Sequence, residues 1–376
     1  MNNKYNTLVF WEPIVSPHKI YFIRMIKKVN PYLDIFYCSN AHLSEDRKKL
    51  GWSIDEKDDG IKYIISPNIE EINLIISKNI ENTLHIFSGI RWVESIINGI
   101  KAVKKYNADF AIMSEPRDHE GFKGFLRYIH SILTENWIKK NVKFILAQGI
   151  YGPIWYKKVG YDTNKIFPFA YFVPPLNNKS LNKGINSPIN IAYIGRLTKS
   201  KGIFELANAI KSINHEYIFH IVGDGEERTT LESFCIENKI NYVFHGVIEN
   251  KNLGTIIRSF DLLALLSLSK DGWGVVISEA LMEGVTCLVS DKVGSSYIMK
   301  NSLFGEQVSP SNRNDIVNKI NKLINSDNFS EKRCRERQSL AISMLSDEAG
   351  AKYFLEILSN FKNTDLITSD FYKINK

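Results

Sequence analysis

The sequence predicts an α/β protein of two doubly wound domains, each built on a parallel sheet. The chain has 376 residues, which exceeds the size at which one hydrophobic core usually stops growing. Short β-branched runs alternate with helical patterns through both halves, as in βαβ units. Residues 172–188, rich in proline and asparagine, interrupt this alternation and predict a boundary between the domains.

The first half begins with a strand pattern and then alternates helix and strand patterns up to a charged loop. These elements are expected at residues 6–11, 18–29, 33–38, 83–89, 91–106 and 109–116. We therefore expect residues 1–172 to form the first domain and residues 173–188 to form a linker.

The second half repeats the same alternation of strands and helices. Strands are expected at residues 189–195, 217–225, 242–248, 262–268 and 286–291, and helices at residues 205–213, 231–239, 252–260 and 276–284. Residues 189–345 thus predict a second doubly wound domain. A final helical pattern and a polar tail, residues 346–376, follow it.

Composition is typical of a globular protein, with 44% hydrophobic and 24% charged residues. No apolar run reaches the roughly 18 to 20 residues that span a bilayer, and residues 1–13 lack the plan of a signal peptide. We therefore expect a cytoplasmic protein. Cys38, Cys235, Cys287 and Cys334 are far apart, which predicts buried thiols rather than disulfides or a zinc site.

The net charge of +7 is confined to the first half of the chain. Residues 1–180 carry 25 Lys/Arg against 18 Asp/Glu, while residues 181–376 carry 23 of each. A basic half suits contact with an anionic membrane surface, to which each nearby Lys or Arg adds about 1 kcal/mol of attraction. A solvated basic face explains the same bias.

Residues 191–210 place Gly195 and Arg196 at a strand end, and Lys201 and Gly202 at a helix start. Two cations and a helix N-terminus would then meet, as a diphosphate requires. The next strand ends in a glycine turn at Gly223. The third glycine of a dinucleotide fingerprint is missing from this turn, so the sequence gives little support to a nicotinamide or flavin cofactor.

Residues 267–295 contain two carboxylates, Asp271 and Glu279, eight positions apart around a glycine-rich turn. Glycines at this turn let the backbone approach an anion closely. The apolar run from Val275 predicts a helix whose first N–H groups face that anion, with Glu279 just inside it. A simple turn capped by the Asp271 side chain is the alternative.

The motifs GRLTKSKG, VGDG, FHGVI and DGWGVVISEALMEG, followed by SDKVGS, resemble in order and spacing the retaining glycosyltransferases of family 4. This resemblance implies the GT-B fold, in which two Rossmann-like domains face a cleft. The first domain then binds the acceptor, the second binds the sugar nucleotide, and the last helix returns to the first domain. The implied donor site comprises Gly195, Arg196, Lys201, Gly223, Val247, Asp271, Gly274, Val275, Val276 and Glu279.

The resemblance also implies a role for each of these residues. Arg196 and Lys201 would bind the diphosphate, and Glu279 the ribose. Val247 would lie near the base, and the backbone amides at 274–276 would face sugar and phosphate. Asp271 stands where the family has Glu, so its contact with the donor sugar needs a closer approach or a water.

The first half resembles the acceptor domain of polysaccharide-building members more loosely. The loop from Pro13 to His18 would carry His18 to an acceptor hydroxyl, although a helix cap explains this histidine equally well. Glu115 follows a predicted strand and would orient the acceptor nucleophile or stabilise positive charge on the donor sugar. A solvated charge cluster around Arg117 is the alternative reading of this loop.

Residues 121–144 interleave aromatic and basic residues, as in a helix at an anionic interface. An amphipathic helix packed on its own domain is the other reading, and no nucleic-acid motif accompanies the segment.

The expected reaction transfers a hexose-type sugar from a UDP- or GDP-linked donor to a hydroxyl of a glycan, with retention of configuration. The expected acceptor is lipid-linked, the expected site is the inner face of the plasma membrane, and the pathway is capsule or lipopolysaccharide assembly. Cations and helix N–H groups can stabilise the leaving diphosphate without a metal, so we expect neither metal nor cofactor, and no nucleic-acid partner. A sugar-nucleotide 2-epimerase and a non-catalytic partner of another transferase remain alternatives.

Overall fold

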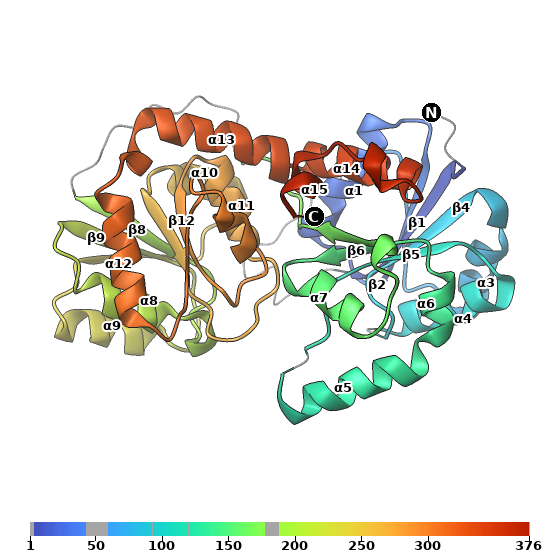
Figure 1. Cartoon of the computed structure of the whole chain (residues 1–376), viewed down its shortest axis with the longest axis horizontal. Helices are drawn as coiled ribbons and strands as arrows, with labels where there is room; N and C mark the ends of the chain where they lie inside the picture. Colours follow the sequence, from blue (N-terminus) through green and yellow to red (C-terminus); the bar gives the residue numbers. More distant parts are fainter. Residues whose placement is uncertain (1–3, 43–58, 92, 119, 177–187, 376) are drawn as a thin grey trace. The chain divides into compact units, whose positions relative to one another are not determined.

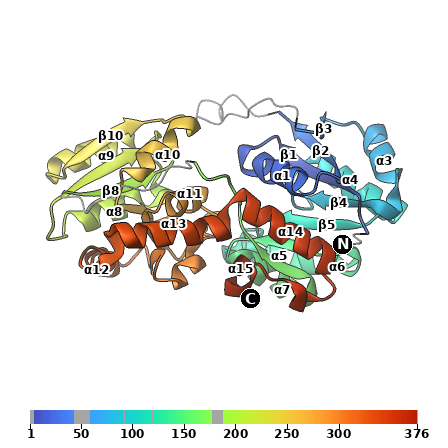
Figure 2. The same ribbon diagram turned by 90° about the horizontal axis from the view of Figure 1, so that it is seen from above.

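The computed structural model describes residues 4–42, 59–91, 93–118, 120–176 and 188–375, and the chain divides into two compact units. In its described residues, unit 1 comprises 4–42, 59–172 and 347–375, and unit 2 comprises 173–176 and 188–346. Both are α/β units with helices on both faces of a parallel sheet (Figures 1 and 2). The predicted fold class, with two Rossmann-like sheets, is confirmed.

Unit 1 contains a seven-stranded sheet of order β3-β2-β1-β4-β5-β6-β7. Its strands are β1 (Thr7–Ile14), β2 (Asp34–Ala41), β3 (Ile61–Ile65), β4 (Thr83–Phe87), β5 (Phe110–Ser114), β6 (Ile145–Gln148) and β7 (Ile166–Phe169). Its helices are α1 (Pro17–Val29), α3 (Ile69–Ser77), α4 (Glu94–Tyr106), α5 (Gly121–Thr134), α6 (Asn136–Asn141), α7 (Tyr151–Lys158), α14 (Asp347–Asn360) and α15 (Asp370–Asn375).

Alternating side chains of β1 divide the core of unit 1 between two faces. Val9 and Trp11 pack in the cluster that contains residues of α3, α4 and α7. Phe10 lies on the other face, 6.2 Å between ring centroids from Phe354 of α14. Phe354 also meets Phe22 of α1 edge-on at 5.9 Å. Helix α14 therefore forms part of the core of unit 1.

Unit 2 contains a six-stranded parallel sheet of order β10-β9-β8-β11-β12-β13, the strand order of dinucleotide-binding domains. Its strands are β8 (Ile189–Ile194), β9 (Tyr217–Val222), β10 (Tyr242–Gly246), β11 (Leu262–Leu265), β12 (Thr286–Ser290) and β13 (Gly305–Val308). Its helices are α8 (Ile203–Ile210), α9 (Arg228–Glu237), α10 (Asn250–Arg258), α11 (Val275–Met282), α12 (Arg313–Ile324) and α13 (Glu331–Leu345).

All four cysteines are buried and free, as the sequence predicted. Within the described residues, no helix combines the length and apolar character needed to cross a bilayer.

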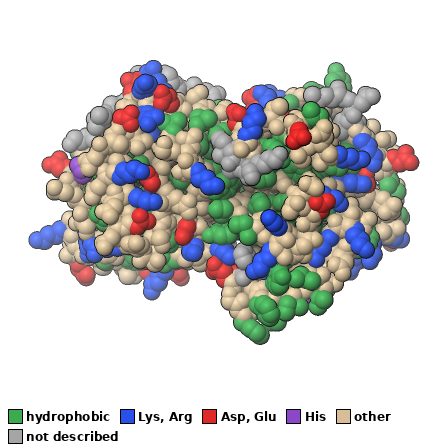
Figure 3. Space-filling model, viewed as in Figure 1, with side chains coloured by type: hydrophobic (Ala, Val, Ile, Leu, Met, Phe, Trp, Pro, Cys, Tyr) green, Lys and Arg blue, Asp and Glu red, His purple; other side chains and the backbone are tan. Residues whose placement is uncertain are grey.

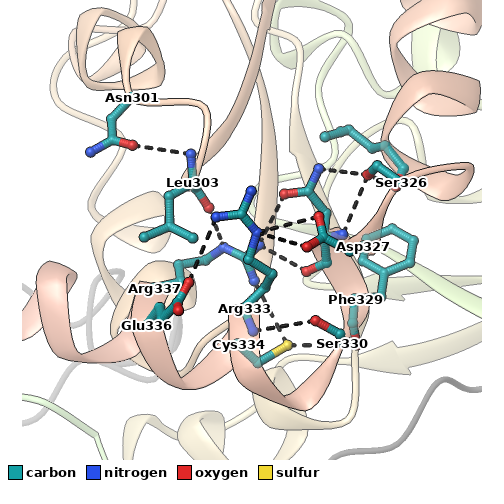
Figure 4. A network of polar contacts seen from close by, with 12 residues as sticks. Asn301, Leu303, Ser326, Asp327, Phe329, Ser330, Arg333, Cys334, Glu336 and Arg337 are labelled. Atoms are coloured by element: carbon teal, nitrogen blue, oxygen red, sulfur yellow. Dashed lines mark hydrogen bonds and ion pairs between the residues drawn. The ribbon is translucent and has the colours of Figure 1, made fainter.

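A fully buried arginine on α13 joins three segments of unit 2 (Figure 4). The Arg337 guanidinium donates to the carbonyl oxygens of Leu303 at 2.6 Å, Gly284 at 2.7 Å and Asn328 at 2.9 Å. Burial lowers the pKa of Arg337, and the three carbonyls compensate for the lost water. The Arg337 side chain therefore links α13 to three segments: the one that follows α11, the one that precedes β13, and the turn at Asn328.

We expect Arg337→Met to lower the free energy of unfolding of unit 2 by about 3 kcal/mol, because three buried carbonyl oxygens lose their donor. The matched control is Arg333→Met on the same helix. Arg333 pairs with Asp327 at 3.2 Å and is one-third exposed, so its loss should cost less than about 0.5 kcal/mol. Hydrogen exchange of peptides from residues 284–345 measures both variants, and equal effects would contradict the role of Arg337.

Candidate active site

The candidate site lies at the carboxyl ends of β8 and β11, where the strand order of unit 2 reverses. These two strands are neighbours. The strand that follows β8 in the chain, β9, lies on one side of this pair, and the strand that follows β11, β12, lies on the other. Ligands of open α/β sheets bind outside the carboxyl ends of strands at such a switch point. The loops that follow β8 and β11 carry Lys201 and Asp271 respectively.

Glycines let the loops at this edge approach one another closely. A Cβ atom on Gly223 would lie 2.0 Å from the carbonyl oxygen of Gly195, so the loops after β9 and β8 are in backbone contact. A Cβ atom on Gly202 would lie 1.8 Å from the carbonyl oxygen of Leu266. Gly202 has φ +68°, a conformation that favours glycine. The glycines at 202 and 223 thus serve packing of the loops themselves.

Lys201 and Asp271 form an ion pair across the switch point. Lys201 Nζ lies 2.5 Å from Asp271 Oδ2, which also accepts a hydrogen bond from Ser267 Oγ at 2.7 Å. The other carboxylate oxygen accepts from the backbone N–H of Gly272 at 3.0 Å. The Lys201 side chain keeps 32% of its surface exposed, so the ammonium remains accessible to an anion.

Arg196 follows β8 and is exposed. Its guanidinium makes no hydrogen bond or ion pair with the described part of the chain. Its carbonyl oxygen accepts from the Tyr193 hydroxyl at 2.7 Å. Burial raises the pKa of Tyr193, the charge of Asp271 raises it further, and Arg196 opposes this shift. Tyr193 is therefore near both charged residues, a position that the sequence did not indicate.

The helix α11 begins at Val275, as the sequence predicted, after Gly274 in a left-handed conformation with φ +74°. A Cβ atom on Gly274 would lie 2.8 Å from Val293 Cγ1, so any side chain here would be strained and crowded. The amide N–H groups of Gly274, Val275 and Val276 donate to no acceptor in the described residues. The first turn carries no acidic side chain, so this helix N-terminus favours a bound anion.

Glu279 lies one turn further along α11 and is partly buried. Burial, and secondly the charge of Glu283, raise the pKa of Glu279 to about 7. Glu283 is fully buried and pairs with Arg258 at 2.7 Å. The Glu279 carboxyl group therefore changes its charge near neutral pH.

Val247 follows the edge strand β10, next to Gly246 with φ +68°. The side chain is 45% exposed. The glycine turn after β9 reaches this strand, because Gly223 donates its N–H to the carbonyl oxygen of Gly246 at 2.8 Å. Val247 therefore stands at the same edge of the sheet as the turn at Gly223.

Unit 1 has a corresponding switch point between β1 and β4, and two buried charged residues lie there. Glu12 near the end of β1 accepts a hydrogen bond from Ser88 after β4. Lys19 in the first turn of α1 is 6% exposed. Burial lowers the pKa of Lys19, while the carboxylates of Glu12 and Glu115 oppose this shift. Glu12 Oε1 and Lys19 Nζ have no hydrogen-bond partner within the described residues.

The two residues expected to bind the acceptor, His18 and Glu115, both contact Tyr171. The His18 ring meets the Tyr171 ring edge-on at 6.3 Å between centroids. Glu115 accepts a hydrogen bond from the Tyr171 hydroxyl, and burial together with this carboxylate raises the pKa of Tyr171. Lys19 Nζ lies 5.0 Å from the centroid of the same ring. Tyr171 thus contacts both the first turn of α1 and the loop that follows β5.

The expected loop from Pro13 to His18 is shorter than predicted. β1 includes Pro13, and α1 begins at Pro17, so His18 belongs to the first turn of the helix. It is not the N-cap, because Ser16 occupies that position. Sequence reasoning also missed Glu12, Lys19 and Tyr171, although a glutamate ending an apolar strand was a signal.

A cavity of about 740 Å³ also opens in unit 1, beside the N-termini of α3 and α4. Most of its lining residues have polar side chains, and the lining comprises Asn40, Ser66, Pro67, Asn68, Ile69, Glu70, Glu94, Ser95 and Asn98. Amide, hydroxyl and carboxylate groups of this kind hydrogen-bond sugar hydroxyls.

The arrangement in unit 2 can bind an anion by two different means, an accessible ammonium and the unpaired amides of α11. Both can stabilise negative charge that develops on a leaving group. Glu279 offers a carboxyl group to hydroxyls nearby. Unit 1 supplies a carboxylate, Glu115, and an imidazole, His18, at the carboxyl edge of its sheet.

Comparison with known proteins gives relatives that include glycosyltransferases. An uncharacterized glycosyltransferase of Methanocaldococcus jannaschii is 30% identical over 145 residues, 38% of this chain and 37% of the relative. The capsular polysaccharide biosynthesis glycosyltransferase CapM of Staphylococcus aureus is 26% identical over 213 residues, 54% of this chain and 51% of CapM. The alignments thus span about one-third to one-half of these relatives.

Among solved structures, HepE of Anabaena in complex with UDP superposes with a TM-score of 0.71. The match covers 94% of this chain and 99% of HepE at 14% identity, which shows a common fold. The family model of glycosyl transferases group 1 matches residues 177–363, the segment that holds the ion pair and α11. Through these residues the chain belongs to the family of glycosyl transferases group 1.

Proposed function

We propose that the protein is a retaining glycosyltransferase that moves a sugar from a nucleoside-diphosphate sugar to a hydroxyl of a glycan. The observation that carries the proposal is the Lys201–Asp271 ion pair of 2.5 Å beside the unpaired amides of α11. This combination suits a ligand with an anionic part next to hydroxyl groups. A sugar attached to a diphosphate is such a ligand.

In the proposed reaction, the bond between the anomeric carbon and the diphosphate oxygen breaks, and its electron pair leaves with the diphosphate. The acceptor hydroxyl oxygen forms the new bond to that carbon, and the hydroxyl proton passes to an oxygen of the departing diphosphate. Lys201, the exposed Arg196 and the amides at 274–276 stabilise the departing charge. Such preorganised donors can each contribute about 3 kcal/mol to the transition state.

The remaining donor contacts follow from the positions of the side chains. Glu279 binds ribose hydroxyls. Asp271, which accepts a hydrogen bond from Ser267 at 2.7 Å, contacts the donor sugar. The exposed Val247 lies beside the base, while Gly195 and Gly223 shape the turns around the diphosphate. The UDP complex of HepE supports a uridine nucleotide as the first donor to test, with a guanosine nucleotide as the second.

Unit 1 binds the acceptor in this proposal, with His18 and Glu115 near the reacting hydroxyl. Lys19 Nζ and Glu12 Oε1, which have no hydrogen-bond partner within the described residues, offer hydrogen bonds to further hydroxyls or water. The role of CapM in capsular polysaccharide biosynthesis supports a polysaccharide pathway. We propose a lipid-linked acceptor at the inner face of the plasma membrane, since growing glycans are carried there while sugar nucleotides are cytoplasmic.

A 2-epimerase of the same fold would convert the sugar nucleotide without an acceptor, and a non-catalytic partner would bind it without turnover. Thermal shifts with UDP, GDP and ADP identify the base, because bound ligand raises the apparent stability. Incubation with donor alone then reveals any epimer. An epimer, or activity only with a second protein, would contradict the proposed transfer.

Lys201→Ala should weaken UDP binding roughly 10- to 100-fold, because a charge-assisted contact is lost, and should lower sugar transfer further. The matched control is Lys199→Ala in the same turn, whose side chain is 78% exposed and should leave both quantities unchanged. Titration calorimetry with UDP measures the binding. Near-normal binding and turnover in Lys201→Ala would refute the diphosphate assignment.

UDP affinity should depend on pH through Glu279. If only the ionised carboxylate accepts ribose hydrogen bonds, a pKa of about 7 predicts roughly eightfold weaker binding at pH 6.0 than at pH 7.5. Glu279→Gln should remove this component, and it also controls for protonation of UDP itself. The same pH dependence in both proteins would exclude Glu279 as its origin.

The Glu279 carboxyl also makes the stability of unit 2 depend on pH. Its pKa is raised in the folded chain, so the folded state binds its proton more tightly than the unfolded state does. This contribution to stability is present at acidic pH and is lost as the pH rises through about 7. Relative to the parent, Glu279→Gln without ligand should gain stability above pH 7. Melting curves at pH 5 and pH 8 check the sign.

Glu115→Gln should lower kcat roughly 100-fold or more, since a carboxylate near the reacting hydroxyl contributes on this scale. UDP affinity should stay unchanged, because Glu115 belongs to unit 1. Glu120→Gln, an exposed residue five positions later, is the control. Equal kcat values for the two variants would show that Glu115 has no part in the reaction.

A further inference from the structure

The helix α5 turns an apolar stripe toward solvent. Phe122, Phe125, Leu126 and Leu133 are 75%, 55%, 49% and 68% exposed, and Ile129 and Ile132 complete the stripe. These six positions recur at helical spacing along one face. Figure 1 shows α5 at the lower end of unit 1, and Figure 3 shows hydrophobic side chains gathered there.

Unit 1 covers the opposite face of α5, which carries Gly124, Ser131 and the partly buried ring of Tyr128 packed against the core. Only Gly124 and Ser131 of the helix are buried. Arg117 donates to Ser131 Oγ at 3.0 Å, and Lys139 donates to the Ser131 carbonyl oxygen at 3.2 Å. The helix is therefore fixed with its apolar face outward.

Packing on its own domain, one of the two readings of residues 121–144, holds for Tyr128, Trp137 and Phe144. It does not hold for Phe122 and Phe125, which are exposed.

The chain around the stripe is strongly basic. Residues 121–158 contain seven Lys/Arg and one Asp/Glu. That acid, Glu135, is 1% exposed and binds Arg91 at 2.5 Å and Tyr161 at 2.7 Å. Two acids precede the helix: Asp118, which pairs with Arg127 at 2.7 Å, and Glu120. Lys143 pairs with Asp109 at 2.7 Å. Beyond these pairs, residues 121–158 still carry an excess of positive charge.

We propose that the α5 stripe inserts into the surface of a bilayer that contains anionic lipid. Apolar side chains at the level of the acyl chains, with basic side chains at the headgroups, are the arrangement of an interfacial helix. A second copy of this chain fits less well, because it would bring two basic flanks together. This assignment of a partner rests on the proposed function, in which the acceptor is lipid-linked.

The position of α5 in the chain connects the bilayer surface to the candidate acceptor residues. Glu115 follows β5 directly, and α5 begins six residues later at Gly121. Both are parts of unit 1. A unit anchored through α5 would therefore hold the Glu115 segment close to the membrane surface, where a lipid-linked glycan is found.

The test is sedimentation of the full chain with vesicles of phosphatidylcholine, with or without phosphatidylglycerol. The parent should bind the anionic vesicles more tightly, and added salt should weaken this binding. Phe122→Ser/Phe125→Ser should reduce the partition coefficient roughly tenfold or more. The control is Leu74→Ser/Ile236→Ser, two helical positions that are 67% and 64% exposed elsewhere and should not matter.

A second pair of variants separates charge from apolar contact. Lys123→Gln/Lys140→Gln removes two exposed cations near the stripe and should lower binding to anionic vesicles several-fold, with little effect on neutral ones. Melting curves verify that all variants are folded.

Three outcomes would overturn the bilayer assignment. The first is no binding of the parent to anionic vesicles, and the second is an equal loss of vesicle binding in the Leu74/Ile236 control. The third is a dimer of the parent that dissociates in the Phe122/Phe125 variant, with no vesicle binding by either protein. UDP binding, measured in parallel, tests the proposed function separately. Vesicle binding without nucleotide binding would refute the transferase, whereas nucleotide binding without vesicle binding would refute only the role of α5.

Discussion

The candidate active site depends on a single electrostatic contact, the ion pair between Lys201 and Asp271. It joins the loop after β8 to the loop after β11, and this is possible only because the two strands are neighbours at the reversal of strand order. Close backbone contact supports the pair, since Gly202 lies against the carbonyl of Leu266 and Ser200 accepts from Leu268 at 2.8 Å. The charges are thus held at one edge of the sheet before any ligand binds, which reduces the reorganisation that binding requires.

The sequence predicts well those features of the site that depend on residues close together in the chain. Gly274 has a left-handed conformation, and α11 begins at the next residue. An apolar run after a glycine-rich turn predicts a helix start at this point. The strand before Gly195 and the position of Glu279 inside a helix follow from the same kind of local pattern. The contact between Lys201 and Asp271 does not, because the residues are 70 positions apart and meet only through the strand order. Tyr193 and Ser267 bond to Arg196 and Asp271, only three and four positions away, but no sequence pattern indicated the direction of these two side chains.

Unit 1 shows where local patterns mislead. The stripe of α5 has the periodicity of a helix packed on a core, and periodicity alone cannot tell whether the domain or another partner covers an apolar face. The answer lies in the other face, where Gly124 and Ser131 allow close contact with unit 1. Likewise, Glu12 and Lys19 occupy an apolar strand and a helix start, and only the fold buries them at one switch point.

The two switch points share a topology but differ in how far water reaches their charges. In unit 1 the Lys19 side chain is almost fully buried, and desolvation lowers its pKa, while the carboxylates of Glu12 and Glu115 oppose this shift. In unit 2 the Lys201 side chain is one-third exposed, so water reaches its ammonium group. An incoming diphosphate would replace that water while Asp271 stays bound to Ser267 and Gly272. The same edge of the same fold therefore holds buried ionisable side chains in unit 1 and a water-accessible ammonium group in unit 2.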